Sequence, residues 1–296
     1  MAKSKQETLT RRMLKRYAVT SSKGFKLRGI DPQDTLGLKE KEARAALAKD
    51  VARLDELQEM LYAQDQWGVL LIFQAMDAAG KDGAIEHVMS GINPQGCQVF
   101  SFKAPSAEEL DHDFLWRTSK CLPERGRIGI FNRSYYEETL VVRVHPPILA
   151  GQHLPKELVT KSIWEERLED IAAFERYFAR QGYLILKFFL HISKEEQKAR
   201  FLARLDEPEK NWKFALGDVR EREHWDAYMK SYEAAIRATA APHAPWFVVP
   251  ADHKWFTRLV ISQTLVAAIE GLDLAWPKPV LVPADLAAAR RALAQD

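Results

Sequence analysis

Short apolar runs alternate with longer amphipathic stretches along residues 68–250. The runs have the length of β-strands, and the stretches between them have the periodicity of helices. This alternation is typical of β-α-β units, which build a parallel sheet flanked by helices. The predicted strands are Gly68–Phe73, Cys97–Phe102, Arg127–Phe131, Tyr183–Leu190 and Trp246–Val249. The pattern therefore predicts an α/β fold around a five-stranded parallel sheet.

Helical periodicity and helix-end signals place helices between and beyond the strands. Ser106-Ala-Glu-Glu109 forms a capping box, which opens a helix that Pro123 stops. The predicted helices are Lys39–Ala63, Gly83–Ile92, Ser106–Leu122, Lys156–Arg180, Glu195–Leu205, Glu221–Thr239, Lys254–Gly271 and an Ala-rich final helix.

The chain is expected to form one domain over residues 1–296, because it has no internal repeat and no linker rich in Pro, Gly or Ser. Residues 1–66 are predicted to form a basic arm and a helical extension, residues 67–272 the core, and residues 273–296 a tail. Residues 204–222 have no strong period and are predicted to form an exposed, mobile lid within the core.

The composition is that of an ordinary folded protein. Of the 296 residues 47% are hydrophobic and 28% are charged, which excludes disordered and collagen-like chains. No apolar run reaches the roughly 18–20 residues of a membrane-spanning helix, so we expect a soluble protein without a membrane partner. The two cysteines, Cys97 and Cys121, have neither CxxC spacing nor a disulfide framework. The expected compartment is therefore the reducing cytoplasm.

Charge is distributed unevenly, although the formal net charge is only +2. Residues 1–28 contain nine basic side chains and one acid, so this segment carries +8 and the remainder −6. A basic arm raises the local concentration of an anionic ligand, whereas many terminal charges are simply solvated. Both interpretations stay open. The small net charge predicts no nucleic-acid partner.

The first predicted strand runs into a loop with the features of a phosphate-binding P-loop. In such loops backbone N–H groups and the positive end of the next helix hold phosphate oxygens, while a lysine, here Lys81, reaches the terminal group. Two residues depart from G-x-x-x-x-G-K-[ST], because Ala75 replaces the first Gly and Asp82 the hydroxyl residue. The alternative is a plain strand-to-helix turn. The predicted phosphate-binding residues are Ala78, Ala79, Gly80, Asp82 and Gly83.

A second group is expected beside this loop, because open α/β sheets bind ligands at the carboxyl ends of their strands. Asn132 stands where a Walker B acid would lie, and Arg133 has a planar fork that suits phosphate. Asp77 would be repelled by phosphates unless a cation lay between them, and Glu137 could restore the charge that Asn132 lacks. Asp77 and Glu137 are therefore the predicted metal ligands. The alternative is that Arg133 and Glu137 merely pair on a surface turn.

The lid segment carries basic side chains that would close over substrates, exclude water and neutralise charge in a phosphoryl-transfer enzyme. The alternative is a solvated loop that Trp212 and Phe214 anchor to the core. The eight histidines show no metal-ligand spacing. The basic residues of the lid are Arg204, Lys210, Lys213, Arg220 and Arg222.

Four ordered strings resemble motifs of the polyphosphate kinase 2 family. They are LLIFQAMDAAGKDGAIEHV, GIFNRSYYEETLVVRVHP, LHISKEEQKARFLARLDEPEKNWKF and APWFVVPADHKWFTRLVIS, and the resemblance covers roughly residues 57–272. The resemblance implies a P-loop kinase fold similar to thymidylate kinase, with a helical lid. It also implies phosphoryl transfer between inorganic polyphosphate and a nucleotide, with magnesium.

Functional residues follow from the resemblance position by position. Asp77 and Lys81 match the Walker A acid and lysine, and Arg133 matches the Walker B arginine. Asn132 with Glu137 resembles the subgroup called class III, which phosphorylates nucleoside mono- and diphosphates. Ala75 departs from the Gly usual in the family, which leaves the loop details open. The segment Arg204–Arg222 matches the lid, and Asp218, Trp225 and Tyr228 fit the pattern around its end.

The sequence thus predicts reversible, polyphosphate-dependent conversion of AMP to ADP and ATP, or of the guanine nucleotides. Asp77, Lys81, Asn132, Arg133 and Glu137 are the predicted catalytic residues, and Arg204, Lys213 and Asp218 the predicted ligand-binding residues of the lid. The resemblance implies Mg²⁺ as cofactor and a homo-oligomer, either a dimer or a tetramer. The alternatives are an ATP-dependent nucleoside monophosphate kinase and a non-catalytic sensor of nucleotide or polyphosphate.

Overall fold

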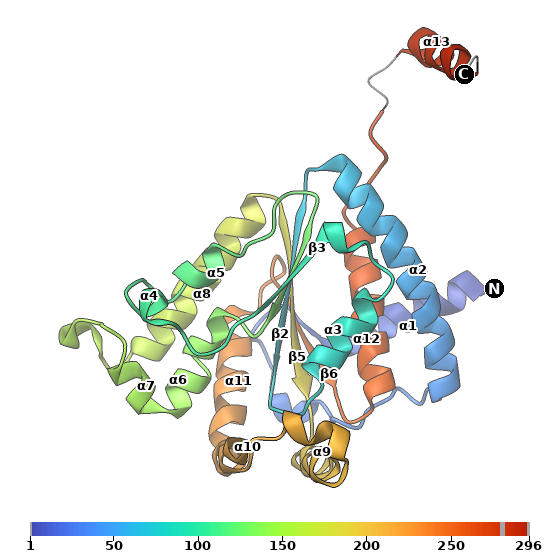
Figure 1. The fold of residues 1–296 in the computed structure, drawn as a ribbon. Helices are drawn as coiled ribbons and strands as arrows, with labels where there is room; N and C mark the ends of the chain where they lie inside the picture. Colours follow the sequence, from blue (N-terminus) through green and yellow to red (C-terminus); the bar gives the residue numbers. More distant parts are fainter. Residues whose placement is uncertain (1, 279–281, 295–296) are drawn as a thin grey trace.

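The computed structural model describes residues 2–278 and 282–294 and has a central sheet between two helical layers (Figure 1). The sheet has the order β1-β6-β5-β2-β4-β3. All neighbouring strands are parallel except β1, which pairs antiparallel with β6. The strands are β1 Ala18–Val19, β2 Gly68–Ala75, β3 Cys97–Ser101, β4 Ile128–Asn132, β5 Tyr183–His191 and β6 Trp246–Pro250.

The five predicted strands are present, but the prediction of a five-stranded, all-parallel sheet is wrong because β1 adds a sixth strand. β1 has only two residues, Ala18 and Val19, which lie opposite Phe247 and Trp246. Two residues are too few to produce an alternating pattern, so nothing in the local sequence reveals this strand.

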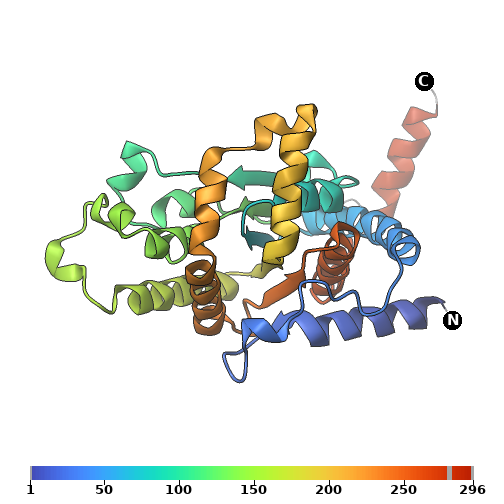
Figure 2. The ribbon, with the colours of Figure 1, turned by 90° about the horizontal axis from the view of Figure 1, so that it is seen from below.

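Helices cover both faces of the sheet. Helices α2, α3 and α12 lie on one side, and α8 and α11 lie on the other, with α4 to α7 beyond them (Figures 1 and 2). No helix among the described residues is long and apolar enough to cross a membrane. The helices are α1 Ala2–Tyr17, α2 Glu40–Gln64, α3 Lys81–Met89, α4 Ala107–Leu110, α5 Trp116–Ser119, α6 Val141–Val144, α7 Pro146–Ala150, α8 Ile163–Arg180, α9 Lys194–Asp206, α10 Leu216–Glu221, α11 Trp225–Thr239, α12 Lys254–Glu270 and α13 Pro283–Leu293.

Three predicted helices are divided in the structure, and others differ from the prediction by one to three residues at their ends. The stretch Ser106–Leu122 forms two short helices, α4 and α5, because the Asp113 carboxylate accepts the Leu115 N–H at 2.9 Å and turns the chain between them. Residues 156–158 form a separate turn of 3₁₀ helix before α8. The stretch Glu221–Thr239 divides into the end of α10, another 3₁₀ turn and α11.

The N-terminal segment folds onto the domain and is not a free arm. Met13 and Tyr17 of α1 are almost fully buried, and the Tyr17 ring meets Phe256 of α12 edge-on. The basic side chains Arg11, Arg12, Lys15 and Arg16 face solvent on the other side of the helix. Both sequence-based interpretations of this segment therefore omitted its packing role.

The topology identifies the carboxyl ends of the parallel strands as the expected position of a ligand site. The first long strand, β2, lies between β4 and β5, so the chain leaves β2 in one direction and later returns on its other side. Ligands of open α/β sheets bind at such a switch point, outside the carboxyl ends of the strands. The loop after β2 contacts the turn after β4 through Asp77 and Arg133, and it contacts helix α9 through Gln197.

Candidate active site

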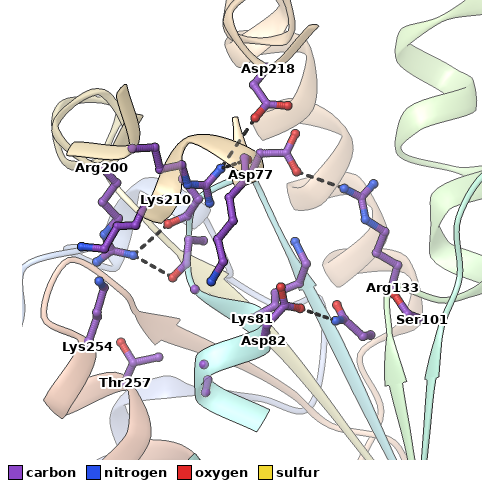
Figure 3. Close-up of a pocket in the computed structure, with 18 of the residues that line it drawn as sticks. Asp77, Lys81, Asp82, Ser101, Arg133, Arg200, Lys210, Asp218, Lys254 and Thr257 are labelled. Carbon is purple, nitrogen blue, oxygen red and sulfur yellow. Dashed lines mark hydrogen bonds and ion pairs between the residues drawn. The ribbon is translucent and has the colours of Figure 1, made fainter. Parts of the chain in front are cut away.

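A cavity of about 760 Å³ lies at the carboxyl ends of β2, β3 and β4 (Figure 3). The lid and the start of α12 complete its walls. Predicted residues that line it are Asp77, Ala78, Ala79, Gly80, Lys81, Asp82, Gly83, Asn132, Arg133, Arg204, Lys210, Lys213 and Asp218. The structure therefore brings together the loop, the turn after β4 and part of the lid, whereas Glu137, Arg220 and Arg222 do not line the cavity.

The loop between β2 and α3 has the backbone conformation of a tight phosphate-binding turn. Ala78 and Gly80 both adopt positive φ, 61° and 99°, and α3 begins directly at Lys81. Glycine adopts this conformation without strain at position 80. The Lys81 ammonium group donates to the Ala75 carbonyl at 3.1 Å. Ala75 itself is the last residue of β2 and pairs with Leu190, so this position needs no glycine.

The surroundings of Lys81 disfavour its charged form in the absence of a bound anion. Burial lowers the pKa of its ammonium group, and the nearby Arg133 lowers it further. An anion bound between Lys81 and Arg133 would favour the charged form of the lysine, because an opposite charge stabilises an ammonium ion.

Helix α9 holds the loop by its backbone carbonyls. Gln197 donates to the Asp77 carbonyl at 2.9 Å, and Arg200 donates to the carbonyls of Ala78 and Ala79 at 3.0 and 2.8 Å. Arg222 donates to Gln197 at 2.6 Å. Arg222 therefore supports the loop through Gln197 and does not line the cavity, whereas the sequence analysis expected it to close over substrates.

Arg200 also ties the loop to the segment before α12. Its other guanidinium nitrogens donate to the Ala251 and Asp252 carbonyls at 2.6 and 3.0 Å and to Glu196 at 2.8 Å. All five N–H donors of this arginine are thus in use. Although Arg200 borders the cavity, these bonds make it a positioning residue.

Arg133 connects two carboxylates at the mouth of the turn after β4. Its guanidinium donates to Asp77 at 3.0 Å and to Glu137 at 3.1 Å. Burial alone would lower the pKa of Arg133, but the two carboxylates raise it overall. Arg133 has φ of 64°, and this left-handed backbone at the end of β4 directs the chain into a 3₁₀ turn at Tyr135–Glu138.

The turn after β4 is anchored in the core. Gln74 is completely buried on β2; with its amide nitrogen toward Glu137, it donates to that carboxylate at 2.8 Å and accepts from the Ser134 N–H at 3.2 Å. The hydroxyl groups of Tyr135 and Tyr136 donate to Glu175 at 3.0 and 2.8 Å. Both tyrosines therefore anchor the turn that carries Arg133 and Glu137 to the core.

The centre of this anchor is a buried ion pair. Lys187 of β5 and Glu175 of α8 are almost fully buried and lie 2.5 Å apart. Lys187 also donates to the Thr239 carbonyl at 2.9 Å and to Tyr136 at 3.1 Å. Burial lowers the pKa of Lys187, which the Glu175 charge opposes.

Two of the three departures from the Walker templates, Asn132 and Asp82, contact each other. Asn132 donates its amide to the Asp82 carboxylate at 2.5 Å (Figure 3). An aspartate at position 132 would place two carboxylates at this distance. The amide at the Walker B position is thus matched to the acid at the end of the Walker A loop, a pairing that the sequence analysis missed.

Charged side chains of the lid pair with one another. Arg204 lies 3.6 Å from Asp218, and Lys210 forms an ion pair with Glu207. Burial and the nearby Asp77 raise the pKa of Asp218. Trp212 does not anchor the lid to the core, because 78% of its surface is exposed, whereas Phe214 contacts Phe201 of α9 edge-on.

Several cavity residues were missed by the sequence analysis. Lys254 and Arg258 follow the last strand, β6, and the rule that ligands bind at the carboxyl ends of strands could have found them. Ser101 is the last residue of β3 and Lys103 follows it, so both could have been found in the same way. Missed lining residues are Ser101, Phe102, Lys103, Arg200, Lys254, Thr257 and Arg258.

The carboxylates at the cavity are compatible with a phosphate-bound metal ion. Among the described residues no group of three or more His, Cys, Asp or Glu side chains could hold a metal. Mg²⁺ needs no such cage, because it commonly binds one or two carboxylates together with substrate phosphates and water. Asp77 lines the cavity and fits this role, whereas Glu137 lies behind Arg133.

Comparisons with known proteins agree with this geometry. The polyphosphate kinase 2 family model matches residues 37–275. ADP-polyphosphate phosphotransferase from Rhodopseudomonas palustris is 58% identical over 233 residues, which cover 78% of this chain and 81% of that protein. AMP/ADP-polyphosphate phosphotransferase from Meiothermus ruber is 46% identical over 268 residues, which cover 90% and 96%.

A solved structure shows the same fold. The crystal structure of polyphosphate kinase 2 from Arthrobacter aurescens superposes with a TM-score of 0.85 at 43% sequence identity, over 93% of this chain and 94% of that chain. The predicted P-loop kinase fold is confirmed. With the match of the family model over most of its length, the chain belongs to the polyphosphate kinase 2 family.

Proposed function

We propose that this protein transfers phosphoryl groups reversibly between inorganic polyphosphate and the nucleotides AMP and ADP. The observation that carries the proposal is the cavity, in which Lys81, Arg133 and the amides of a tight loop converge at the switch point of the sheet. The relatives from R. palustris and M. ruber are named for transfer between polyphosphate and ADP or AMP.

The proposed chemistry needs no covalent intermediate. An acceptor phosphate oxygen is already a nucleophile, so positioning and electrostatic stabilisation supply the catalysis. Lys81, Arg133 and the amides of Ala78–Gly83 would hold the transferred phosphoryl group. Arg204, Lys213 and Asp218 would close over it from the lid and exclude water.

Mg²⁺ is the proposed cofactor, with Asp77 as its first protein ligand. Glu137 pairs with Arg133 behind the cavity wall, so it would serve as the second ligand only after leaving Arg133. A bound Mg²⁺ would neutralise charge on the phosphates during transfer. Arg133 contacts both carboxylates and so sets their separation in this structure. Asn132 keeps Asp82 in place beside this group. A dimer or tetramer remains the expected assembly.

One experiment tests the proposal against its alternatives. AMP, ADP, GMP and GDP are incubated separately with polyphosphate and magnesium, without ATP, and the products are analysed. We expect AMP to yield ADP and then ATP, and EDTA to stop the reaction. An ATP-dependent monophosphate kinase would leave polyphosphate unused, and a sensor would give no product with any donor.

A further inference from the structure

The end of the lid is attached to both halves of the candidate site. Arg222, the last residue of the lid, donates to Gln197 of α9, which holds the Walker loop. The residue before it, Glu221, has a carboxylate oxygen 3.0 Å from the Nε2 atom of His145. His145 directly follows α6, and α6 itself follows the turn after β4. Two adjacent side chains therefore connect the lid to two different parts of the protein.

The contact between His145 and Glu221 is a hydrogen bond from the imidazole to a charged carboxylate. Burial alone would raise the pKa of Glu221, but the hydrogen bonds from His145 and Tyr228 lower it overall. A deprotonated carboxylate only accepts hydrogen bonds, so the Nε2 atom of His145 donates. The Tyr228 hydroxyl donates to the same carboxylate oxygen at 2.8 Å. Glu221 is thus held by one donor beside α6 and by another on α11.

The backbone and the ring of His145 are both held in place. The His145 N–H donates to the Val141 carbonyl at 2.9 Å, and its carbonyl accepts from the Ile148 N–H at 2.9 Å. Pro146 follows, and proline restricts the backbone of the residue before it. The imidazole meets the ring of His224 edge-on, with 4.9 Å between the ring centroids. A donor that is already fixed loses little conformational entropy when it binds the lid.

Helix α10 carries the effect of this contact into the cavity. Asp218 and Glu221 are three residues apart on α10, so their side chains are neighbours on one side of the helix. Asp218 lines the cavity and points toward Asp77 (Figure 3). Burial and the charge of Asp77 raise the pKa of Asp218, so the two carboxylates repel each other. A contact at Glu221 that holds α10 therefore keeps Asp218 near a charge that repels it.

These contacts give a residue outside the cavity a role in the reaction. We propose that His145 is a positioning residue: by holding Glu221, it fixes α10 so that Asp218 faces the reacting groups. Closure of a lid completes a catalytic site, so the loss of this contact should reduce turnover more than substrate binding. The proposal rests on the proposed function and adds a residue that sets the position of the lid.

Replacement of His145 by the two amide side chains tests this contact. The amide nitrogen of Gln reaches about as far as Nε2 of histidine, whereas that of Asn falls short by a methylene group. We expect His145→Asn to lower kcat with polyphosphate and ADP about tenfold, as the loss of a hydrogen bond to a charged group does. KM for both substrates should change less than about twofold. His145→Gln should keep kcat within about threefold of the wild-type value.

A matched control and a double-mutant cycle show whether His145 acts through Glu221. His243 is exposed beyond the opposite end of α11, so His243→Gln should leave kcat and both KM values unchanged. Glu221→Gln should lower kcat by itself. In that background His145→Asn should lower kcat by less than about a further twofold, because its partner is already altered. Losses that multiply in the double variant would overturn the proposal.

Hydrogen exchange gives a reading that does not depend on turnover. Without the contact α10 should open more often, so the amides of residues 216–221 should exchange faster in His145→Asn than in the wild type and in His145→Gln. Equal exchange in the three proteins would overturn the proposal, as would a raised KM for ADP with an unchanged kcat. Thermal melting confirms that each variant is folded. Absence of turnover with polyphosphate in the wild type would instead refute the proposed function.

Discussion

The Walker loop and the turn after β4 face the same cavity but are supported in opposite ways. The loop is held from outside the sheet by Gln197 and Arg200 of α9, and Arg222 supports Gln197. The turn is held from within the core, by Gln74 and by the buried pair of Glu175 and Lys187. The helix that holds the loop, α9, leads into the lid, whereas the residues that hold the turn belong to the sheet and the helix packed on it.

This difference indicates which half of the site responds to the lid. Helix α9 leads directly into the lid, and Arg222 is the last residue of the lid, so a movement of the lid would change the contacts behind the Walker loop. The contacts below Arg133 are completely buried and have no partner in the lid. Closure of the lid would therefore adjust the loop amides around a fixed Arg133.

The largest expected effect comes from removing charge on the loop itself. We expect Lys81→Ala and Asp77→Ala each to lower kcat/KM by about 10²–10³, because one stabilising group at the reacting phosphates is typically worth that much. The measurement is steady-state turnover with polyphosphate and ADP, beside thermal melting to confirm folding. Turnover at the wild-type rate by either folded variant would refute the role of the loop.

The second effect tests whether the turn depends on the core. Glu175→Gln leaves the Lys187 charge without its partner in the interior, so we expect the free energy of unfolding to fall by about 3 kcal/mol. The matched variant Glu175→Leu with Lys187→Met removes both charges and should recover part of the loss. Urea denaturation measures both. A loss below about 1 kcal/mol for Glu175→Gln would show that the network is not the anchor.

The third effect tests whether the loop depends on α9. Lysine has three donors and cannot reproduce the five bonds of Arg200, so Arg200→Lys should lower kcat about tenfold. Its free energy of unfolding should change by less than about 1 kcal/mol, because lysine keeps the charge and can donate to three of these acceptors. If this variant lost stability while kcat stayed constant, Arg200 would stabilise the fold and would not position the loop.

The smallest effect concerns the contact that joins the two regions. Asn132→Asp places a second carboxylate beside Asp82, and we expect a loss of about threefold to tenfold in kcat/KM. Adding Asp82→Asn restores one amide and one acid, so the double variant should recover most activity. Rates with AMP and ADP are measured in all four proteins of the cycle. Additive losses in the double variant would mean that the pair is not a unit.

The strands and the Walker loop were predictable because local sequence encodes them. Apolar runs mark the strands, and Gly80-Lys81 at a strand-to-helix junction marks the loop. The family prediction is confirmed by the match over residues 37–275. The roles of the individual residues, the magnesium ligands and the assembly remain predictions.

The supporting residues were not predictable, because their roles arise from contacts between distant segments. Gln197 and Arg200 look like ordinary residues of an amphipathic helix, and only the fold brings them to the loop at positions 77–79. Arg222 belongs to the lid in sequence but points behind the loop in space. The sequence shows which of these side chains are charged, whereas the direction in which each side chain points required the structure.

The short strand β1 has a consequence for the order of folding. β6 is the last strand of the parallel sheet, and among residues 2–278 and 282–294 its outer edge is paired only by Ala18 and Val19. Contacts between such distant segments close slowly, because a long loop must first be ordered. Until that happens, the apolar edge at Trp246 and Phe247 is exposed to other chains, and exposed strand edges promote aggregation. The pairing of the N-terminal segment with β6 would therefore end this exposure, and it would do so only late in folding.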